Sequence, residues 1–513
     1  MKRIGILIES TKSDPYFHET VRALAQGGNA ELFFALAPRD DSSRAPAFLR
    51  WVTGLEIKLL ARLFSKLRKH RQKFDLGEFD HNGITNLNGR MADDLETLRA
   101  LNLDLIVCGD ARTPDPRLAA AAKDGVLSFQ TISPFWQVYH REDSAAFEIQ
   151  LRDGTSNHAL LHGEVPTRRS FSETVVTLYE TGFPWLTRLA VEYAASGKFP
   201  APRPAADVAP RWPNPVQVIA YAVRTKWLLL VYFSERKIFK RFKRWGVAYA
   251  PGDWTSADRA RGTRIRNLPG RYFADPFLAS RDGRTVCFVE DFSFAQKRAR
   301  ISAVEILDDR NYKFLGPAIE EPFHMSFPYV FEYNRDLYMI PETSAANSIR
   351  LYKCAAFPMK WEFQKELLTN IRTADSMLFE HEGHWWLLTN PASPGGTDFS
   401  SQLFAFHAAH PLADSWTPHA QNPLVFDSRS ARNGGLLRLA DGTLARARQG
   451  YAFNLYGARL TLAQIHELTP SAFREEQIRS LAPDFSPGLQ GGHHLFSNGR
   501  YTVYDFVRTE GLK

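Results

Sequence analysis

The sequence predicts an α/β domain with a doubly wound parallel sheet, followed by an all-β five-bladed propeller. Residues 1–180 alternate strand-like apolar runs with amphipathic helices, the second half repeats a two-strand unit five times, and a proline-rich stretch separates the two patterns. A chain of 513 residues is too long for one ordinary hydrophobic core. We therefore expect an α/β domain over 1–180, a linker with a basic connecting helix over 181–244, and the propeller over 245–513.

The first segment begins with KRIGILIES, an apolar run typical of a buried parallel strand, and continues into the helical pattern DPYFHETVRALAQ. AELFFAL predicts the next strand. MADDLETLRALNLDLIVCGD predicts a helix leading into a strand at Leu103–Cys108, DPRLAAAAKDG a helix ending at Gly125, and VLSFQTI a further strand. Strands that alternate with helices are typical of a doubly wound sheet.

Two basic segments carry much of the formal net charge of +8. Leu55–Phe74 and Ser234–Gly246 each place apolar residues at helical spacing against Lys and Arg. This pattern suits peripheral contact with an anionic membrane, and equally a solvated helix packed on its own domain. Nucleic acid is not an expected partner, because no recognition motif accompanies the charge. Pro200–Pro215 predicts a linker, and Pro215–Arg244 predicts a long helix.

The remaining composition indicates a cytoplasmic protein, with peripheral contact at the inner face of the membrane as an open alternative. Cys108, Cys287 and Cys354 form no close-spaced pair, so we expect neither a disulfide framework nor a metal site. The apolar stretch at the N-terminus is too short for a signal peptide. The apolar run Trp227–Phe233 is much shorter than the ~20 residues that cross a bilayer.

The propeller prediction depends on five units that recur every 47 to 59 residues in the second half. They begin at Ala274, Phe327, Ala374, Asn433 and Gly491. Each opens with polar or turn-forming residues, becomes apolar, and is followed by a turn, mostly Asp-Gly, Glu-Gly or Asn-Gly, and a second strand-like run. Short strands at such a period are typical of propeller blades with unequal loops.

A propeller brings the starts of its inner strands together around one axis, so these residues predict a single funnel. The inner strands contribute Asp275, Ser326, Asp375, Asn433 and His493, and the second strands end in Glu290 and Asp291, Glu342, Asn390, Arg448 with Gln449, and Asp505. Because side chains alternate along a strand, we expect only one of Glu290 and Asp291, and at most one of His493 and His494, to face the funnel. Arg446 and Arg448 share a face, which fits a phosphate or carboxylate ligand, or acidic neighbours.

The second half resembles the N-terminal domain of plant glucosamine inositolphosphorylceramide transferase and, more distantly, glycoside hydrolase family 43. The strings FADPFL with FVEDF, HMSFPYVFEYNRDLYMIPE, ADSMLFEHEGHWWLLT, and NLYGARL with GGHHLFSNGRYTVYDF carry this resemblance. It implies a five-bladed propeller that handles carbohydrate. The hydrolase likeness implies Asp275 as base, Asp375 as the carboxylate that orients and tunes, and Glu342 as acid, although Glu342 lies one blade earlier than the acid of those enzymes. His324 and Tyr456 complete the predicted substrate-binding set.

The first half resembles the formyltransferase fold of methionyl-tRNA and sugar-nucleotide formyltransferases. The order of helix, DLIV, helix ending in Gly, strand closing on Ser-Pro, and later hairpin carries the likeness. Ser128 and Gln130 stand where such enzymes carry Asn and His, and the later hairpin has no Asp in the expected stretch. Formyl transfer needs a general base. The resemblance therefore implies a degenerate site that does not use formyl-tetrahydrofolate.

Together these patterns predict a carbohydrate-active protein. The first hypothesis is a glycosyltransferase in cell-surface polysaccharide or glycolipid assembly, with a nucleotide- or lipid-linked sugar as donor and a glycan or glycolipid as substrate. A glycoside hydrolase, a sugar formyl- or acyltransferase, and a non-catalytic glycan-binding scaffold are the alternatives.

Overall fold

A computed structural model describes residues 1–38, 45–109, 115–154, 156–206, 211–439 and 441–511. The chain divides into two compact units. The first comprises Met1–Leu229 with Ser393–Asp398, and the second Leu230–Ala392 with Phe399–Lys513. The first unit thus extends beyond residue 180, because a long helix, Phe171–Ser196, crosses the predicted boundary and packs on its sheet.

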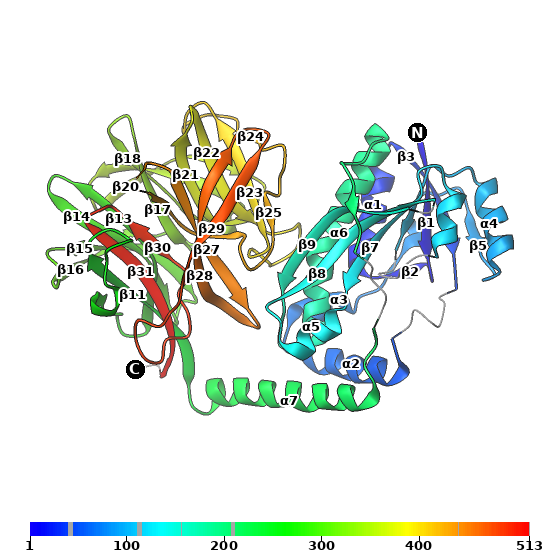
Figure 1. The fold of residues 1–513 in the computed structure, drawn as a ribbon, viewed down its shortest axis with the longest axis horizontal. Coiled ribbons are helices and arrows are strands. Elements are labelled where there is room, and N and C mark those ends of the chain that lie inside the picture. The colour runs from blue at the N-terminus through cyan, green and yellow to red at the C-terminus, as the bar shows by residue number, and fades with distance from the viewer. Residues whose placement is uncertain (39–44, 110–114, 155, 207–210, 440, 512–513) are drawn as a thin grey trace. The chain divides into compact units, whose positions relative to one another are not determined.

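The first unit contains one eight-stranded mixed sheet with helices around it (Figure 1). In sheet order its strands are β10 (Arg203–Pro204), β9 (Ser156–Pro166), β8 (Ser144–Asp153), β7 (Val126–Ile132), β6 (Leu105–Cys108), β1 (Lys2–Ile8), β3 (Ala30–Leu36) and β5 (Ile84–Asn86). From β7 to β5 neighbouring strands run parallel. The α/β prediction is confirmed for this part, whereas β8 and β9 form an antiparallel hairpin, because their short connection cannot make a parallel crossover.

The helices of this unit begin and end at sequence signals. They are α1 (Pro15–Gln26), α4 (Met91–Ala100), α5 (Pro134–His140) and α6 (Phe171–Ser196), with two short strands, β2 (Lys12–Ser13) and β4 (Phe74–Asp75). Asp14 caps α1, and Ser170 caps α6, which ends at Gly197 in the left-handed region. The predicted helix in DPRLAAAAKDG is only a 3₁₀ turn, Pro116–Ala121, and 110–114 lie outside the described residues.

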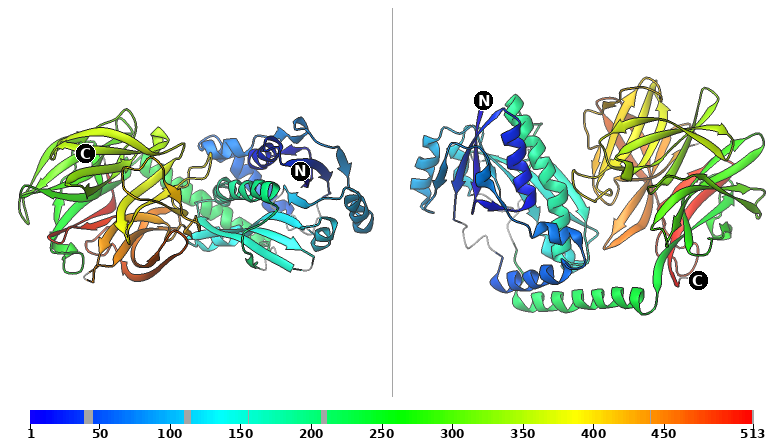
Figure 2. Two further views of the ribbon diagram at one scale, coloured as in Figure 1. Left: turned by 90° about the horizontal axis from the view of Figure 1, so that it is seen from above. Right: turned by 180° about the vertical axis from the view of Figure 1, so that it is seen from behind.

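Three further helices cover the basic segments: α2 (Ala47–Leu60), α3 (Ser65–His70) and α7 (Pro215–Lys237). The helical prediction for Ser234–Gly246 is wrong beyond Lys237, because Arg241 begins a strand that is held in a sheet. Helix α7 is drawn as one long rod in both views of Figure 2. Its length and apolar composition suffice to cross a membrane, in contrast to the short run Trp227–Phe233 considered from sequence.

The second unit is a five-bladed all-β propeller, as predicted. Four blades follow the chain in order, each built from strands that are consecutive in sequence. The first blade is β13 (Arg271–Arg281), β14 (Arg284–Ser293), β15 (Arg298–Ile306) and β16 (Tyr312–Ile319), and the second is β17 (Ser326–Tyr333), β18 (Asp336–Glu342), β19 (Ser348–Ala356) and β20 (Lys360–Thr369). The third blade is β21 (Thr373–His381), β22 (His384–Pro391), β23 (Gln402–Ala408), β24 (Thr417–Pro418) and β25 (Val425–Phe426), and the fourth is β26 (Arg432–Arg438), β27 (Leu444–Ala452), β28 (Leu455–Leu468) and β29 (Phe473–Leu481). The five repeats of the sequence supply the innermost two strands of each blade.

The fifth blade joins the two ends of this unit. The last repeat supplies β30 (Leu495–Ser497) and β31 (Tyr501–Gly511), and the strands β11 (Arg241–Pro251) and β12 (Thr263–Ile265) complete the sheet. Strand β11 pairs with β31 from Arg241 opposite Gly511 to Pro251 opposite Tyr501. The inner strands β13, β17, β21, β26 and β30 contact one another in a closed ring. This closure leaves the propeller without an open end between first and last blades.

Candidate functional site

Four blades interrupt the inner strand at the same place with a β-bulge. The pairing register shifts between Ala274 and Phe277, between Ser326 and Tyr329, between Ala374 and Met377, and between Asn433 and Gly435. Non-glycine residues occupy the left-handed region there: φ is +50° at Asp275, +47° at Phe327 and +48° at Asp375. Bulges and positive φ re-aim side chains and are enriched at functional sites. In two blades the re-aimed side chain is the carboxylate that the sequence singled out.

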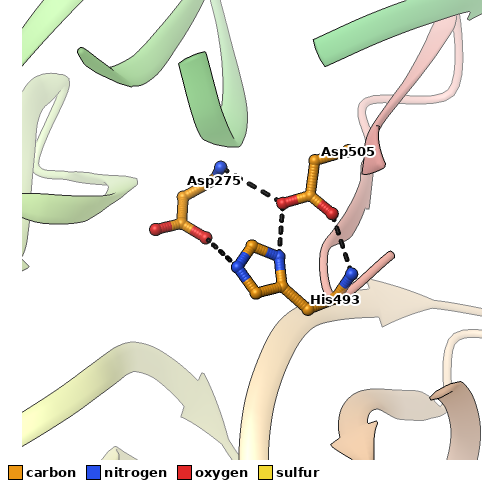
Figure 3. A group of neighbouring side chains, drawn as sticks. All are labelled: Asp275, His493 and Asp505. Carbon is orange, nitrogen blue, oxygen red and sulfur yellow. Dashed lines mark hydrogen bonds and ion pairs between the residues drawn. The ribbon is translucent and has the colours of Figure 1, made fainter. Parts of the chain in front are cut away.

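The centre of the site is a row of three buried groups, Asp275, His493 and Asp505 (Figure 3). His493 Nδ1 contacts Asp505 Oδ2, and its Nε2 lies 3.7 Å from Asp275 Oδ1. Asp505 also accepts hydrogen bonds from the backbone N–H groups of His493, at 2.8 Å, and of Asp275, at 3.4 Å. Asp505 therefore fixes the imidazole ring, which presents its other nitrogen to Asp275.

Charge and burial oppose each other in this row. Burial alone would lower the pKa of His493, but the neighbouring Asp505 carboxylate and Asp275 raise it. Burial would raise the pKa of Asp505, yet His493 and the hydrogen bonds hold it low. His493 and Asp505 thus form an ion pair. Burial raises the pKa of Asp275 to about 7, against the pull of His493 and with the support of the Asp375 and Asp505 charges.

Two glutamates from the ends of second strands complete a carboxyl cluster. Glu290 stands opposite Ala274 across β13 and β14, and Glu342 stands opposite Ser326 across β17 and β18. Burial, with the nearby Asp275 and Glu342, raises the pKa of Glu290 well above its usual range. Burial and Asp375 raise the pKa of Glu342 to about 8. The cluster therefore holds protons near neutral pH, as acid–base catalysis requires.

The remaining aspartate, Asp375, is held as an ion pair. Arg432 Nε lies 2.5 Å from Asp375 Oδ2, and Gln449 Nε2 donates to the same oxygen at 2.7 Å. Asn433 donates its side-chain N–H to the Asp375 carbonyl oxygen at 2.8 Å. The site therefore combines Asp375, which is paired with a guanidinium, with two carboxyl groups whose pKa values are raised, Asp275 and Glu342.

Aromatic rings border the cluster. The Trp245 ring stacks on the His493 ring with centroids 3.8 Å apart and an interplanar angle of 11°. Tyr456 lies edge-on to His493, and the Arg432 guanidinium lies 4.7 Å from the centre of the Tyr456 ring. Sequence analysis missed Arg432 and Trp245. Arg432 directly precedes the Asn433 of the fourth repeat, and Trp245 lies at the predicted start of the propeller, so only the assembled ring brings them here.

Several predicted residues face elsewhere. Asp291 pairs with Arg271 and Arg300 inside its own blade, so that Glu290 is the member of its pair that joins the cluster. His494 packs against Phe277 and Phe327, and burial lowers its pKa to about 3, so only His493 of that pair joins the cluster. His324 lies at the edge, with Nε2 3.7 Å from Glu290.

Arg446 and Arg448 share a face, as expected, but that face looks into the fourth blade. Both guanidinium groups pair with Glu475, at 2.6 Å and 3.3 Å, and Arg446 also donates to backbone carbonyls of Ser430 and Ala431. Arg448 donates to Gln477. The sequence left open whether these arginines bind a phosphate or carboxylate ligand or pair with acidic neighbours. In the structure they pair with an acidic neighbour, Glu475. Arg432 is the guanidinium that lies among the clustered carboxyls.

In the first unit, Ser128 and Gln130 lie buried on β7, and Gln130 Nε2 donates to Ser128 Oγ at 3.1 Å. Glu148 lies on the adjacent strand β8 and His162 on β9 beyond it, and their nearest atoms are 3.2 Å apart. Hydrogen bonds to Glu148 and Glu164 raise the pKa of His162 to about 9. The alternation in FEIQLR and HALLHGE places these polar groups on one sheet face, a signal that sequence analysis left unused. Loss of formyl chemistry stays a prediction.

The row Asp275–His493–Asp505 also has a donor set that suits a divalent cation. One imidazole nitrogen and two carboxylate oxygens lie within 4.8 Å of one another, and all three residues are buried. Nitrogen and oxygen ligands of this kind bind zinc or manganese.

Residues 259–488 match the family described as "Glucosamine inositolphosphorylceramide transferase 1, N-terminal". The protein called glucosamine inositolphosphorylceramide transferase 1 from Arabidopsis thaliana is 35% identical over 214 residues, and that from Oryza sativa subsp. japonica is 32% identical over 213 residues. Each match covers 41% of this chain and 28% of the relative. The propeller resembles the N-terminal domain of that transferase, and the chain spans less than a third of the relatives' length.

Solved structures with a similar fold are glycoside hydrolases. The catalytic domain of a family 62 alpha-L-arabinofuranosidase from Coprinopsis cinerea is 11% identical, with a TM-score of 0.36 over 52% of this chain and 97% of that chain. A thermostable family 43 glycoside hydrolase is 9% identical, with a TM-score of 0.32 over 41% of this chain and 76% of that chain.

Proposed function

We propose that the propeller funnel is a glycosyl-transfer site that acts in glycolipid or polysaccharide assembly. One observation carries the proposal: Asp275, which is buried, and Glu342, which is half-buried, have pKa values near neutrality and lie close to the ion pair of Asp375 and Arg432. Glycosyl chemistry needs one carboxyl group that accepts a proton and another that donates one. Residues 259–488 match a family that is named after a transferase acting on inositolphosphorylceramide. This similarity supports a glycolipid as the class of substrate.

In the proposed reaction an acceptor hydroxyl attacks the anomeric carbon of a bound sugar, and the bond from that carbon to the leaving oxygen breaks. Asp275 in its ionised form accepts the hydroxyl proton, and protonated Glu342 donates a proton to the leaving oxygen. His493, fixed by Asp505, orients and stabilises the Asp275 carboxylate. Asp375, paired with Arg432, stabilises the positive charge that develops on the sugar ring. A nucleotide- or lipid-linked sugar is the proposed donor.

Hydrolysis is the second candidate, because water in place of the acceptor uses the same carboxyl groups. The raised pKa values of Asp275 and Glu342 favour it as much as transfer. The two reactions differ only in what occupies the acceptor position. Transfer and hydrolysis are therefore distinguished by analysis of the products, because the arrangement of the carboxyl groups is the same for both reactions.

The test uses the full chain with a panel of nucleotide sugars and a glycolipid acceptor. Wild type is compared with Asp275→Asn and with Asp336→Asn, a matched substitution at a half-exposed aspartate that pairs with Lys353. We expect nucleotide release to fall at least about 100-fold in Asp275→Asn, as for loss of a general base, and to be unchanged in Asp336→Asn.

The products decide between the alternatives. Labelled sugar on the lipid supports transfer, and free sugar released from glycans supports hydrolysis. Sugar binding without turnover in wild type would leave a glycan-binding scaffold and refute the proposed chemistry. Tight calorimetric binding of formyl-tetrahydrofolate would instead place the activity in the first unit.

A further inference from the structure

Helices α2 and α7 expose large apolar side chains that the proposed function does not use. On α2, Trp51 and Leu59 expose 62% and 59% of their surface, and Phe48 and Leu55 are exposed on the same side. On α7, Val223 and Trp227 expose 64% and 62%. Soluble proteins rarely gather exposed residues of this size.

Along α7 these residues form a continuous stripe. Val216, Ile219, Val223, Trp227 and Leu230 are exposed and recur at intervals of three or four residues. Val218, Tyr221 and Thr225 are the buried residues of the same helix. At 3.6 residues per turn the two sets lie on opposite sides. Helix α7 therefore has one apolar side that packs on the protein and a second that packs on nothing in the described chain.

Within the first unit, α2 and the start of α7 are fixed to each other. Tyr221 donates a hydrogen bond from its hydroxyl to Glu56 of α2, and Glu56 also accepts the backbone N–H of Ser172 at 2.9 Å. Leu229 packs against the cluster that contains Leu60 and Leu67. Figure 1 shows α2 beside the first part of α7, the part that belongs to this unit. The two exposed stripes are thus carried by helices that are held together.

Basic side chains accompany this surface. Lys58, Arg62, Arg68 and Arg71, with Ala61, line a hollow of about 600 Å³ at the end of α2. Among the described residues no carboxylate lies within ion-pair distance of these four cations. Lys226 is exposed on α7, which ends in exposed Arg236 and Lys237. The hollow concentrates positive charge without compensation, which favours an anionic ligand.

We propose that α2 and α7 form a docking surface for an anionic lipid bilayer, with both helices lying in the plane of the interface. Apolar side chains, tryptophans and clustered Lys and Arg are the combination that binds this environment. The apolar stripes enter the acyl boundary, and the hollow lined by Lys58, Arg62, Arg68 and Arg71 accepts lipid phosphate groups. Helix α7 does not cross the bilayer, because Val218, Tyr221 and Thr225 are committed to packing within the protein.

Flotation of the chain of 513 residues with vesicles tests this proposal. Vesicles of phosphatidylcholine alone are compared with vesicles containing ~30% phosphatidylserine, at low and at high salt. We expect wild type to float with the anionic vesicles and to be released as salt rises. The double variants Val223→Glu/Trp227→Glu and Trp51→Glu/Leu59→Glu should weaken binding at least about tenfold. Lys58→Gln/Arg62→Gln should weaken it about tenfold on anionic vesicles.

The matched control is Leu307→Glu/Ile478→Glu, which introduces the same two charges at exposed apolar residues of the propeller. It should bind as wild type does. Circular dichroism of every variant verifies that loss of binding is not loss of fold. The readout is independent of catalysis, so it stands whether or not the funnel transfers sugar.

Three results would overturn the proposal. Folded wild type that does not float with anionic vesicles would refute it. A concentration-dependent dimer that Val223→Glu/Trp227→Glu dissociates, without vesicle binding, would show that a second copy covers the surface. Resistance of membrane-bound wild type to alkaline carbonate extraction would show that α7 spans the bilayer.

Discussion

At the scale of single residues, the pKa values in the site depend on which carboxyl groups are paired with a cationic side chain. Asp375 has Arg432 and Asp505 has His493, whereas the buried Asp275 and the half-buried Glu342 have more negative than positive charge around them. A buried carboxyl without full compensation keeps its proton to a higher pH. The same residue types thus acquire different protonation states from their neighbours, as acid and base roles require.

The raised pKa of Glu342 predicts a dependence of stability on pH. A carboxyl in the unfolded chain has a pKa of about 4, so below that pH both states carry the proton and its contribution to stability is complete. As the pH rises toward the folded value of about 8, the unfolded state releases its proton first, and the free energy of unfolding falls by at most about 1.4 kcal/mol per pH unit. Urea unfolding between pH 4 and 9 should show a shallower decline in Glu342→Gln than in wild type.

Glu305→Gln is the control with the opposite sign. Hydrogen bonding to Arg284 lowers the pKa of Glu305, so its contribution to stability is present above the unfolded pKa and is lost as the pH falls through the folded value. The difference between this variant and wild type should therefore vary only in the acid range. A Glu342→Gln curve parallel to that of wild type from pH 4 to 9 would contradict a raised pKa.

The ion pair of Asp375 and Arg432 predicts a large loss when only one partner is removed. Arg432→Leu leaves a buried carboxylate without its cation, and we expect the free energy of unfolding to fall by about 3–5 kcal/mol. The double variant Arg432→Leu/Asp375→Leu should lose less, because no unpaired charge remains. Denaturant unfolding of both measures the difference, and a double variant at least as unstable as the single one would contradict the proposed pairing.

At the scale of elements, the bulge at the start of each inner strand places the funnel residues. It shifts the pairing register by the same step in four blades and supplies the positive φ at Asp275, Phe327 and Asp375. The Phe327 N–H donates to Asp275 Oδ2 at 3.2 Å, so the bulge of the second blade holds the carboxylate of the first. The bulges therefore connect neighbouring blades as well as orienting side chains.

Gly435 tests the bulge of the fourth blade. Its φ is +128°, and a Cβ there would lie 2.2 Å from the Leu495 carbonyl oxygen of the fifth blade. Gly435→Ala should therefore destabilise by at least about 2 kcal/mol, since backbone strain and a clash with backbone add. Gly283→Ala is the control, with φ of +75° and open space around the new methyl group, and should cost about 1 kcal/mol or less. Equal losses in thermal unfolding would refute the clash.

At the scale of the whole molecule, the propeller depends on one joint between distant parts of the chain. Strands β11 and β31 pair over their full length, although more than 200 residues separate them. A propeller closed in this way has no free first or last blade. The stability of the funnel, which lies inside the ring, depends on this pairing.

Truncation before Tyr501 removes β31 and tests the joint. We expect the backbone amides of β13 and β14 to lose most of their protection against hydrogen exchange, because their blade loses its neighbour in the ring, while those of β1 and β3 in the first unit keep it. Removal of residues 512–513 alone is the control and should change nothing. Retained protection in β13 after the longer truncation would show that the blades are stable without closure.

The cytoplasmic location expected from the sequence stays a prediction. The sequence predicted membrane contact through Leu55–Phe74 and Ser234–Gly246. We propose instead that α2 and α7 make this contact, because part of the segment after Lys237 belongs to strand β11.

The sequence by itself determined the local features of this protein. Periodicity and turn residues predicted the α/β unit, the five blades and the strand ends that carry Asp275, Glu342, Asp375 and Asp505, because strand alternation and turn chemistry are properties of a few adjacent residues. Strand alternation also predicted that only one of Glu290 and Asp291, and at most one of His493 and His494, faces the funnel, but it did not say which one.

Only the tertiary structure decided how these side chains pair. Arg432 and Trp245 join the funnel, Arg446 and Arg448 pair with Glu475, and Asp291 pairs within its blade. These outcomes, and the pKa values near neutrality, depend on which charges from distant repeats come within a few ångströms and how far water is excluded. Such distances arise when the ring closes between β11 and β31, and no local pattern encodes them.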